Sequence, residues 1–517
     1  MALSLSRSEL KHEDGVVVDQ LEDSSKVYGS HTSSTVPQHY KPQTEEQRAL
    51  DRKINLKLDI FVVAILSAGF ILCGIDKTNI GFIATSTFIT DAHLSPNTVA
   101  TTLTLFSATY VPLQPLSTLA ARRIGPKWWI AFLLIIWGAL CMAHAAVKNN
   151  ATLVALRLLL GAAESGFTPS SYYLMSMVYP KYALGMRMGV FSGMFAIAGA
   201  CAGLISYGLL HINNEHIKGW QVVFLFEGGL TVLVGVLTLL LVPSNVHTAW
   251  FLSPTERAHA VGRMVTDLAA SQRLEDEAEV VAESDTISLK DITDVLKDWK
   301  KLLIMLFNMT GVLPVSAFTT FLPLIVEGMG YNGIRATVMS VPPFVVGAVG
   351  LVLIVYSSDR FKERSLHIVG GMLLALVGCI VMATSSDPKL RYGFSHVCLA
   401  GVFVSGPLAA VWLAGNTPLK GPRSFALGLN GWTNIGGVIA GQIFNVKYAP
   451  TYKVPLVITM VLIAFGAVGM VFVRVMYQLT NRWRTRKTAR WGESEHAAEA
   501  DSPVRRGDQK YTYIYGY

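Results

Sequence analysis

Charged residues are scarce in this 517-residue chain: Asp, Glu, Lys and Arg make up 15% of it, whereas 51% of its residues are hydrophobic. The mean hydropathy of +0.43 is higher than the surface of a water-soluble globular protein tolerates. This shortage of charge excludes an ordinary soluble protein and predicts an integral membrane protein.

Cysteine is also rare, and its five residues all lie within apolar runs. Because no CxxC pair and no Cys/His cluster is present, the sequence offers neither a disulfide framework nor a metal site. A nucleophile elbow and a phosphate-cradling glycine loop are missing as well. We therefore expect no enzyme, no metal and no cofactor.

Apolar runs of about 20 residues, the length needed to cross a bilayer, follow a polar segment that does not read as a signal peptide. The runs form two sets of six, which lie at 56–84, 99–120, 128–147, 151–178, 188–210 and 219–242, and at 301–325, 334–356, 365–384, 394–416, 424–446 and 454–476. The pattern predicts an all-α membrane protein with twelve transmembrane helices in two halves.

Five regions follow from this pattern. We expect a polar amino-terminal tail at 1–55, a six-helix bundle at 56–242, a linker at 243–300, a second six-helix bundle at 301–476 and a tail at 477–517. The linker holds most of the concentrated acidity of the chain, so it must lie in water rather than in hydrocarbon.

The basic residues predict the orientation. The chain has 43 Lys and Arg against 35 Asp and Glu, a formal charge of +8, and basic residues beside membrane spans set topology rather than bind nucleic acid. The reverse orientation would place both basic tails and the linker outside. We therefore expect both termini to be cytoplasmic. The expected partner is the lipid bilayer and not nucleic acid.

A weak internal repeat supports two related halves. Arg122 and Arg123 follow the second apolar run, and Asp359 and Arg360 follow the eighth run at the equivalent place. Duplicated halves around a central site are typical of secondary transporters. This organisation favours a carrier over a channel.

Ionisable residues within the runs mark the candidate site. Burying a charge at this depth costs about 2.5 to 3.5 kcal/mol, so Arg157 and Glu164, seven residues apart on one helical face, are expected to face the bundle interior. Asp76, Lys77 and Glu227 are the other candidates. The alternatives are an ion pair that only holds helices together or, for Asp76 and Lys77, a polar cluster near a helix end.

These residues stand in motifs that resemble a known family. The loops that contain Arg122 and Asp359 resemble, incompletely, the signature of the major facilitator superfamily between its second and third helices. The stretches from Asp76 to Ala84 and from Arg157 to Pro169 are similar to the anion:cation symporter family, especially its fungal allantoate, nicotinate and pantothenate permeases. The resemblance implies a twelve-helix rocker transporter that carries small organic anions, usually with protons.

On this resemblance we expect proton-coupled uptake of a small carboxylate, such as a vitamin or an allantoate-like metabolite. The transporter is expected to work as a monomer in the plasma membrane or, alternatively, in a vacuolar or other internal membrane. Arg157 would pair with the negative group of the substrate, and Lys77, where many relatives carry Arg, would supply a point charge. The predicted substrate-binding residues are Lys77, Arg157, Asn79, Trp412, Asn416 and Asn434; the predicted proton-coupling residues are Glu164, Asp76 and Glu227; the predicted conformational-loop residues are Arg122, Arg123, Asp359 and Arg360.

Two other functions remain open at this point. The same fold could export a biosynthetic metabolite, and the dependence of transport on the proton gradient would then have the opposite sign. A nutrient sensor that binds its ligand without transporting it and signals through its tails belongs to a different class. For Asn416 and Asn434, helix-to-helix hydrogen bonding is the alternative to substrate binding.

Overall fold

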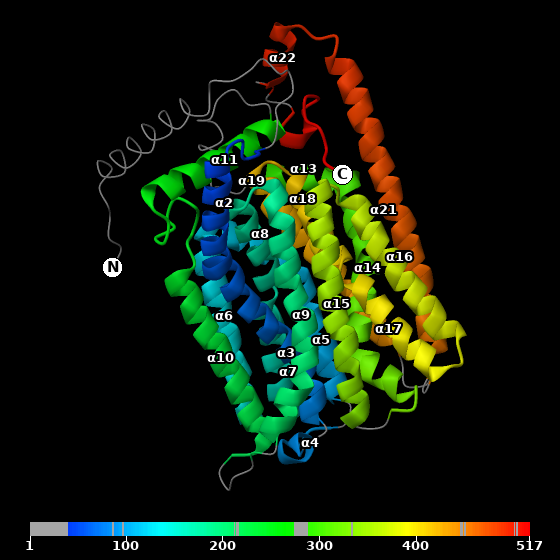
Figure 1. Cartoon of the computed structure of the whole chain (residues 1–517). Helices are drawn as coiled ribbons and strands as arrows, with labels where there is room; N and C mark the ends of the chain where they lie inside the picture. Colours follow the sequence, from blue (N-terminus) through cyan, green and yellow to red (C-terminus); the bar gives the residue numbers. More distant parts are fainter. Residues whose placement is uncertain are drawn as a thin grey trace, which may run out of the picture.

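The protein is a bundle of long helices in a computed structural model (Figure 1). The structure describes residues 40–84, 87–95, 98–210, 212, 217–272, 288–331, 334–444, 448, 451–500, 502 and 505–517, and every regular element in these ranges is helical. The predicted tail residues 1–39 and the linker residues 273–287 lie outside the described ranges.

The first half of the chain builds the helices that precede the linker. They are α2 (Glu45–Leu58), the π-helical turn η1 (Asp59–Val63), α3 (Ala64–Ala84), α4 (Phe88–Asp91), α5 (Thr98–Ile124), α6 (Pro126–Ala143), the short 3-10 helix η2 (His144–Ala146), α7 (Asn150–Glu164), α8 (Phe167–Val178), α9 (Lys181–Leu210) and α10 (Gly219–Leu241).

The linker and the second half follow. Their helices are α11 (Pro254–Gln272), α13 (Leu289–Lys297), α14 (Trp299–Glu327), α15 (Ile334–Phe361), α16 (Ser365–Thr384), α17 (Pro388–Val402), α18 (Ser405–Gly415), α19 (Lys420–Asn430), the 3-10 helix η3 (Gly431–Asn434), α20 (Ile435–Ile443), α21 (Lys453–Thr488), α22 (Glu493–Ala500) and the 3-10 helix η5 (Gly507–Gln509). Helix α21 continues past the predicted boundary at 476.

Each of the twelve apolar runs is helical, which confirms the predicted fold class. The fourth and tenth runs, which occupy equivalent places in the two halves, are each broken: Ser165 and Gly166 separate α7 from α8, and Phe403 and Val404 separate α17 from α18. At Gly166 a Cβ would lie 1.7 Å from Ser117 Oγ, so only glycine permits this approach to α5. The shared break supports an internal duplication.

The outer surface of the bundle is apolar. Large hydrophobic side chains are exposed there, among them Leu240 on α10, Leu353 on α15 and Val468 on α21, which is 70% exposed. In water such a surface would aggregate, whereas in lipid it needs no cover, and helices satisfy their own backbone groups there. In the described part of the chain, nine helices are long and apolar enough to cross a membrane.

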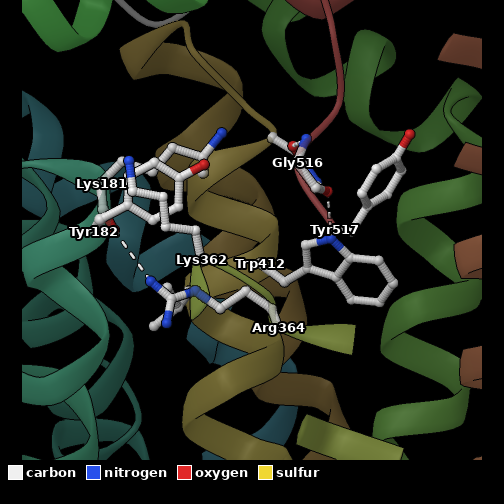
Figure 2. A pocket seen from close by; sticks show the side chains of 10 residues that line it. Lys181, Tyr182, Lys362, Arg364, Trp412, Gly516 and Tyr517 are labelled. Atoms are coloured by element: carbon white, nitrogen blue, oxygen red, sulfur yellow. Dashed lines mark hydrogen bonds between the residues drawn. The ribbon is translucent and has the colours of Figure 1, made fainter. Parts of the chain in front are cut away.

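One end of the bundle carries α11, α13 and residues 505–517, and we call it the linker end (Figure 1). The two halves of the chain meet here across a small pocket (Figure 2). Tyr182, at the start of α9, faces Lys362 and Arg364 of the second half, and the Arg364 guanidinium donates to the Lys181 carbonyl at 3.4 Å. Polar contacts therefore hold the halves together at this end.

A carboxylate of the linker ties α11 to α2. Glu256, at the start of α11, accepts from Lys57 Nζ at 2.6 Å and from the Ser253 backbone at 2.9 Å, and it lies 3.0 Å from Lys53 Nζ. Burial raises the pKa of the Glu256 carboxyl, but the hydrogen bonds from Lys57, Ser253 and Lys53 outweigh burial and lower this pKa to about 2. The ionised Glu256 carboxylate thus stabilises the folded state.

We expect Glu256→Gln to lower the melting temperature at neutral pH, because an amide loses the charge that pairs with both lysines. Since the folded pKa lies below the ordinary value of 4.5, the stabilisation is complete above that value and is lost as the pH falls toward about 2. The gap in melting temperature between parent and variant should therefore narrow from about pH 6 to about pH 3. Glu46→Gln, which changes an exposed carboxylate in α2, is the control; a gap that does not depend on pH contradicts the prediction.

Candidate functional site

A buried ion pair joins α3 to α7 inside the first half. Lys77 Nζ lies 2.9 Å from Glu164 Oε1, and the Glu164 side chain is fully buried. Cys73 Sγ donates to the same carboxylate oxygen at 2.8 Å. Cys73 and Lys77 are one helical turn apart, so α3 presents both side chains on the face that meets α7.

Aromatic rings surround the Lys77 ammonium. Its Nζ donates to the Tyr110 hydroxyl at 3.0 Å and lies 4.1 Å from the centre of the Tyr110 ring. The rings of Phe106 and Phe195 are each 6.0 Å away. Cation–π attraction in a dry setting therefore adds to the ion pair with Glu164. In this conformation the ammonium is partnered by Glu164 and these rings while the Lys77 side chain is 25% exposed, so a role in anion binding and a polar cluster near a helix end both stay predictions.

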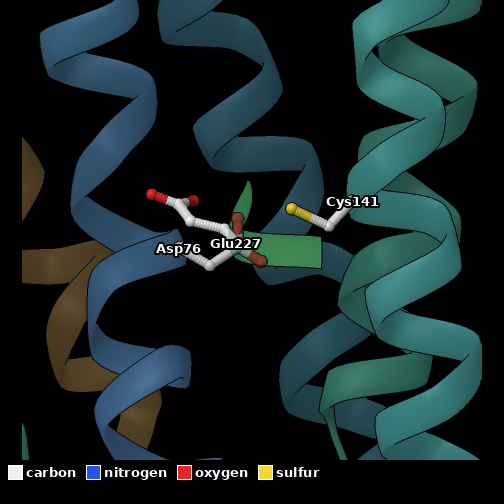
Figure 3. Close-up of side chains that lie close together, drawn as sticks. All are labelled: Asp76, Cys141 and Glu227. Atoms are coloured by element: carbon white, nitrogen blue, oxygen red, sulfur yellow. The ribbon is translucent and has the colours of Figure 1, made fainter. Parts of the chain in front are cut away.

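A second group of side chains, two acids and a cysteine, includes Asp76, the residue just before Lys77 in α3. Asp76, Cys141 and Glu227 come from α3, α6 and α10, all three are buried, and their ligand atoms lie within 4.8 Å of one another (Figure 3). Trp137 Nε1 donates to Asp76 Oδ2 at 2.8 Å, and Asn79 Nδ2 donates to Glu227 Oε1. One further oxygen of each carboxylate has no hydrogen-bond partner among the described residues.

Two carboxylates and a thiol are a donor set that could hold a metal ion or a proton. The nearby Arg157 guanidinium, which acts electrostatically on both Glu227 and Cys141, competes with a metal ion for the same negative charge. The arrangement therefore suits a proton that moves between oxygen atoms next to a fixed cation.

Arg157 is the cation with the fewest partners in this region. It lies on α7, is 3% exposed, and its Nε and Nη2 atoms have no hydrogen-bond partner within the described part of the chain. Glu227 and His144 are its electrostatic neighbours. Two buried guanidinium nitrogens without hydrogen-bond partners are costly, so this site is suited to a negatively charged ligand.

Arg157 and Glu164 share a helical face of α7 but have different partners. Glu164 pairs with Lys77 of α3, whereas Arg157 faces the neighbourhood of Glu227 on α10. A direct Arg157–Glu164 ion pair, the structural alternative from the sequence, does not form in this conformation of the described residues. The two residues instead belong to two adjacent charged groups.

The predicted contacts in the second half lie elsewhere. Trp412 Nε1 and Asn416 Nδ2 both donate to the Gly516 carbonyl, at 2.8 and 2.9 Å, at the linker end. Asn434 Nδ2 donates to the Gly431 carbonyl of its own 3-10 turn at 2.8 Å. In this conformation the structure does not bring these three residues together with Arg157, and a role in substrate binding stays a prediction.

The conformational-loop residues lie at the linker end. Arg122 forms a buried ion pair of 3.1 Å with Asp291 of α13. Asp359 of the second half pairs with Arg364 and accepts from the Met186 backbone of the first half at 2.5 Å. Arg123 and Arg360 are exposed. One residue of each predicted pair therefore takes part in contacts that close this end of the bundle.

Sequence reasoning missed Cys73, Tyr110 and Cys141 as members of the site. Cys73 could have been found, because it lies one helical turn before Lys77. Tyr110 and Cys141 reach the site from other helices, and no local pattern in the sequence marks them. Among the described residues, the site thus gathers side chains from α3, α5, α6, α7, α9 and α10.

Comparisons with known proteins agree on the family. The model of the Major Facilitator Superfamily matches residues 66–441. The MFS-type transporter efuF of Hormonema carpetanum is 30% identical over 85% of this chain and 87% of its own. The high-affinity nicotinic acid transporter of Saccharomyces cerevisiae is 27% identical over 90% of this chain and 85% of its own.

Solved structures with the same fold are more distant in sequence. The proton:xylose symporter XylE aligns with a TM-score of 0.61 and 14% identity over 80% of this chain and 94% of its own. The transporter FucP in its outward conformation aligns with a TM-score of 0.56 and 13% identity over 80% of this chain and 98% of its own. At this identity the likeness supports the fold alone.

The Lys77–Glu164 pair should behave as one unit in stability. Lys77→Met leaves a buried carboxylate without its cation, and we expect a loss of about 3 kcal/mol, the usual cost of breaking a buried pair on one side. Glu164→Gln should cost less, because a neutral amide keeps a hydrogen-bonding group. The double variant should recover most of the loss in the melting temperature of purified protein. Losses that simply add in the double variant would mean that the two groups are not coupled.

Proposed function

The chain belongs to the Major Facilitator Superfamily, and we propose that it takes up a small organic anion together with protons by alternating access. In this mechanism the two halves rock around a central site that opens to one side of the membrane at a time. The single observation that carries the proposal is the buried Arg157 guanidinium, whose Nε and Nη2 lack partners among the described residues.

A carboxylate is the ligand that fits this guanidinium best. Arginine presents a planar fork of donors that matches two carboxylate oxygens, and such charge-assisted bonds are strong in a dry site. A neutral sugar would leave the charge of Arg157 uncompensated. The similarity to a nicotinic acid transporter supports a small monocarboxylate as the substrate class.

The charges of the site support coupling to protons. Asp76, Glu164 and Glu227 offer three carboxyls, whereas Lys77 and Arg157 offer two cations. These five residues form two adjacent charged groups, in which all but the partly exposed Lys77 are buried. With every group ionised, one negative charge stays uncompensated, and burial without a partner is costly. A bound proton removes that charge, and a bound anion at Arg157 increases the need for it. Substrate and proton therefore favour each other's binding.

The direction of transport follows from the gradient that drives it. If protons and anion bind together, a higher proton concentration outside drives the anion inward. A sensor without flux would bind the anion but show no accumulation in vesicles. An exporter would respond to the gradient with the opposite sign.

Replacing Arg157 tests the anion site. We expect Arg157→Ala to weaken binding by about 2 kcal/mol or more, which corresponds to about 30-fold in affinity, because a charge-assisted pair is lost. Arg157→Lys should keep part of the charge but lose the fork. Thermal-shift titrations of purified protein with nicotinate and a panel of other small carboxylates, followed by uptake into proteoliposomes, measure both effects. Full uptake by the Ala variant would remove Arg157 from the site.

Replacing Glu164 tests the coupling. We expect Glu164→Gln to bind and exchange substrate but not to accumulate it when external acid supplies the driving force, because an amide releases no proton. Proton-driven uptake and substrate counterflow are measured in the same vesicles. Glu327→Gln, at the exposed end of α14, is the matched control and should retain both. If the Glu164 variant also retains both, the coupling site is elsewhere, with Asp76 and Glu227 the next candidates.

A further inference from the structure

Residues 505–517 form an ordered segment that folds back onto the linker end of the bundle (Figure 1). Tyr513 and Tyr515 are buried, at 2% and 4% exposure. If the segment lay free in water, these tyrosine rings would be exposed to solvent, and that exposure costs free energy. The segment therefore has a receptor surface on the bundle.

The backbone of this segment is held by side chains of the second half. Trp412 Nε1 and Asn416 Nδ2 donate to the Gly516 carbonyl at 2.8 and 2.9 Å, and the Gly516 amide donates to Asn416 Oδ1 at 2.8 Å. Figure 2 shows Trp412 and Gly516 side by side. Asn481 of α21 binds both backbone groups of Tyr515 in the same way, at 2.9 Å each. These paired bonds resemble strand pairing and fix the register of the segment.

Ring stacking and ion pairs add to the backbone contacts. The Tyr515 ring stacks on Tyr477 of α21 with a centroid distance of 4.4 Å and an interplanar angle of 1°. Asp508 pairs with the buried Lys301 of α14 at 2.8 Å, and Arg484 donates to the Asp508 carbonyl at 3.0 Å. The contacts are specific to individual residues rather than a general apolar cover.

The segment also reaches the first half. Asp291 of α13 pairs with Arg122 of α5 at 3.1 Å and with Arg506 of the segment at 3.3 Å, so one carboxylate joins the two. Gly516 lies against Lys181 at the start of α9, since a Cβ on this glycine would lie 3.1 Å from Lys181 Nζ. The segment thus lies across the line along which the halves meet.

We propose that residues 505–517 act as a latch that holds the linker end closed and must leave its receptor before that end opens. This latch rests on the alternating access proposed above and not on the identity of the substrate. Asp291 pairs with both Arg122 and Arg506, and Gly516 lies against Lys181. When the halves separate at the linker end, these contacts cannot all be kept. Docking of the segment therefore shifts the population toward the closed linker end.

The experiment measures opening directly and needs no substrate. Thr118 of α5 is completely buried at the contact between the halves, where a Cβ on Gly428 of α19 would lie 2.8 Å from its Oγ1. A Thr118→Cys reporter in purified protein is therefore labelled by a maleimide only when the linker end opens. The same protein without the reporter gives the background from the five native cysteines.

Tyr515→Ala in the reporter protein removes the stacked ring, and Ile514→Ala is the matched control, because Ile514 is the adjacent residue and is 46% exposed. We expect Tyr515→Ala to label the reporter about tenfold faster, a shift of about 1.4 kcal/mol, and the control to label at the parental rate. Asn481→Leu, which removes the paired bonds from the receptor side, should label as fast as Tyr515→Ala and serves if that variant does not fold.

A peptide with the sequence of residues 505–517 provides the second arm. Added to the Tyr515→Ala protein, it should restore slow labelling, whereas a scrambled peptide should not. Unchanged labelling in a folded Tyr515→Ala or Asn481→Leu protein would overturn the latch, even if the melting temperature falls, because the segment would then only stabilise the fold. Fast labelling that the peptide does not slow would overturn it as well. Neither outcome bears on Arg157 or on the organic anion.

Discussion

The ion pair between Lys77 and Glu164 fixes the centre of the first half. A charge inside a membrane bundle is costly unless it is paired. Lys77 Nζ of α3 lies 2.9 Å from Glu164 Oε1 of α7, and Lys77 also donates to the Tyr110 hydroxyl of α5. Once α3 is held in this rotation, Asp76 must face α6 and α10, where Trp137 and Glu227 lie. The rotation of one helix thus decides the partners of two charged groups.

The role proposed for Arg157 depends on its exclusion from the Lys77–Glu164 pair. Glu164 is engaged with Lys77 and Cys73, so the guanidinium on the same helix has no carboxylate at bonding distance within the described residues. A fully paired set of five charges would be a structural network, and its net charge would not respond to a ligand. With three carboxyls against two cations, one bound proton would neutralise the set, and the proposed anion at Arg157 would add one further negative charge.

The linker end depends on a different kind of contact. Here Arg122 of the first half forms a buried ion pair with Asp291 of the linker helix α13, and Asp359 of the second half accepts from the Met186 amide of the first half. When the surfaces separate, polar groups of this kind exchange their protein partners for water, so the net free energy of a hydrogen bond between the halves is small. Residues 505–517 add a layer of the same kind across this boundary. The apolar core and the polar contacts of the linker end therefore occupy different levels of the bundle.

The sequence by itself determined the membrane class, the twelve helical runs and nearly every charged residue of the site. These features are local: hydropathy over about 20 residues decides whether a helix spans, and a charge within such a run must face inward. Only the tertiary structure decided which charges meet. Lys77 rather than Arg157 binds Glu164, Cys141 joins Asp76 and Glu227, and Trp412 and Asn416 hold the backbone of Gly516. These choices depend on how helices far apart in the chain rotate and cross, and a one-dimensional pattern does not encode that rotation.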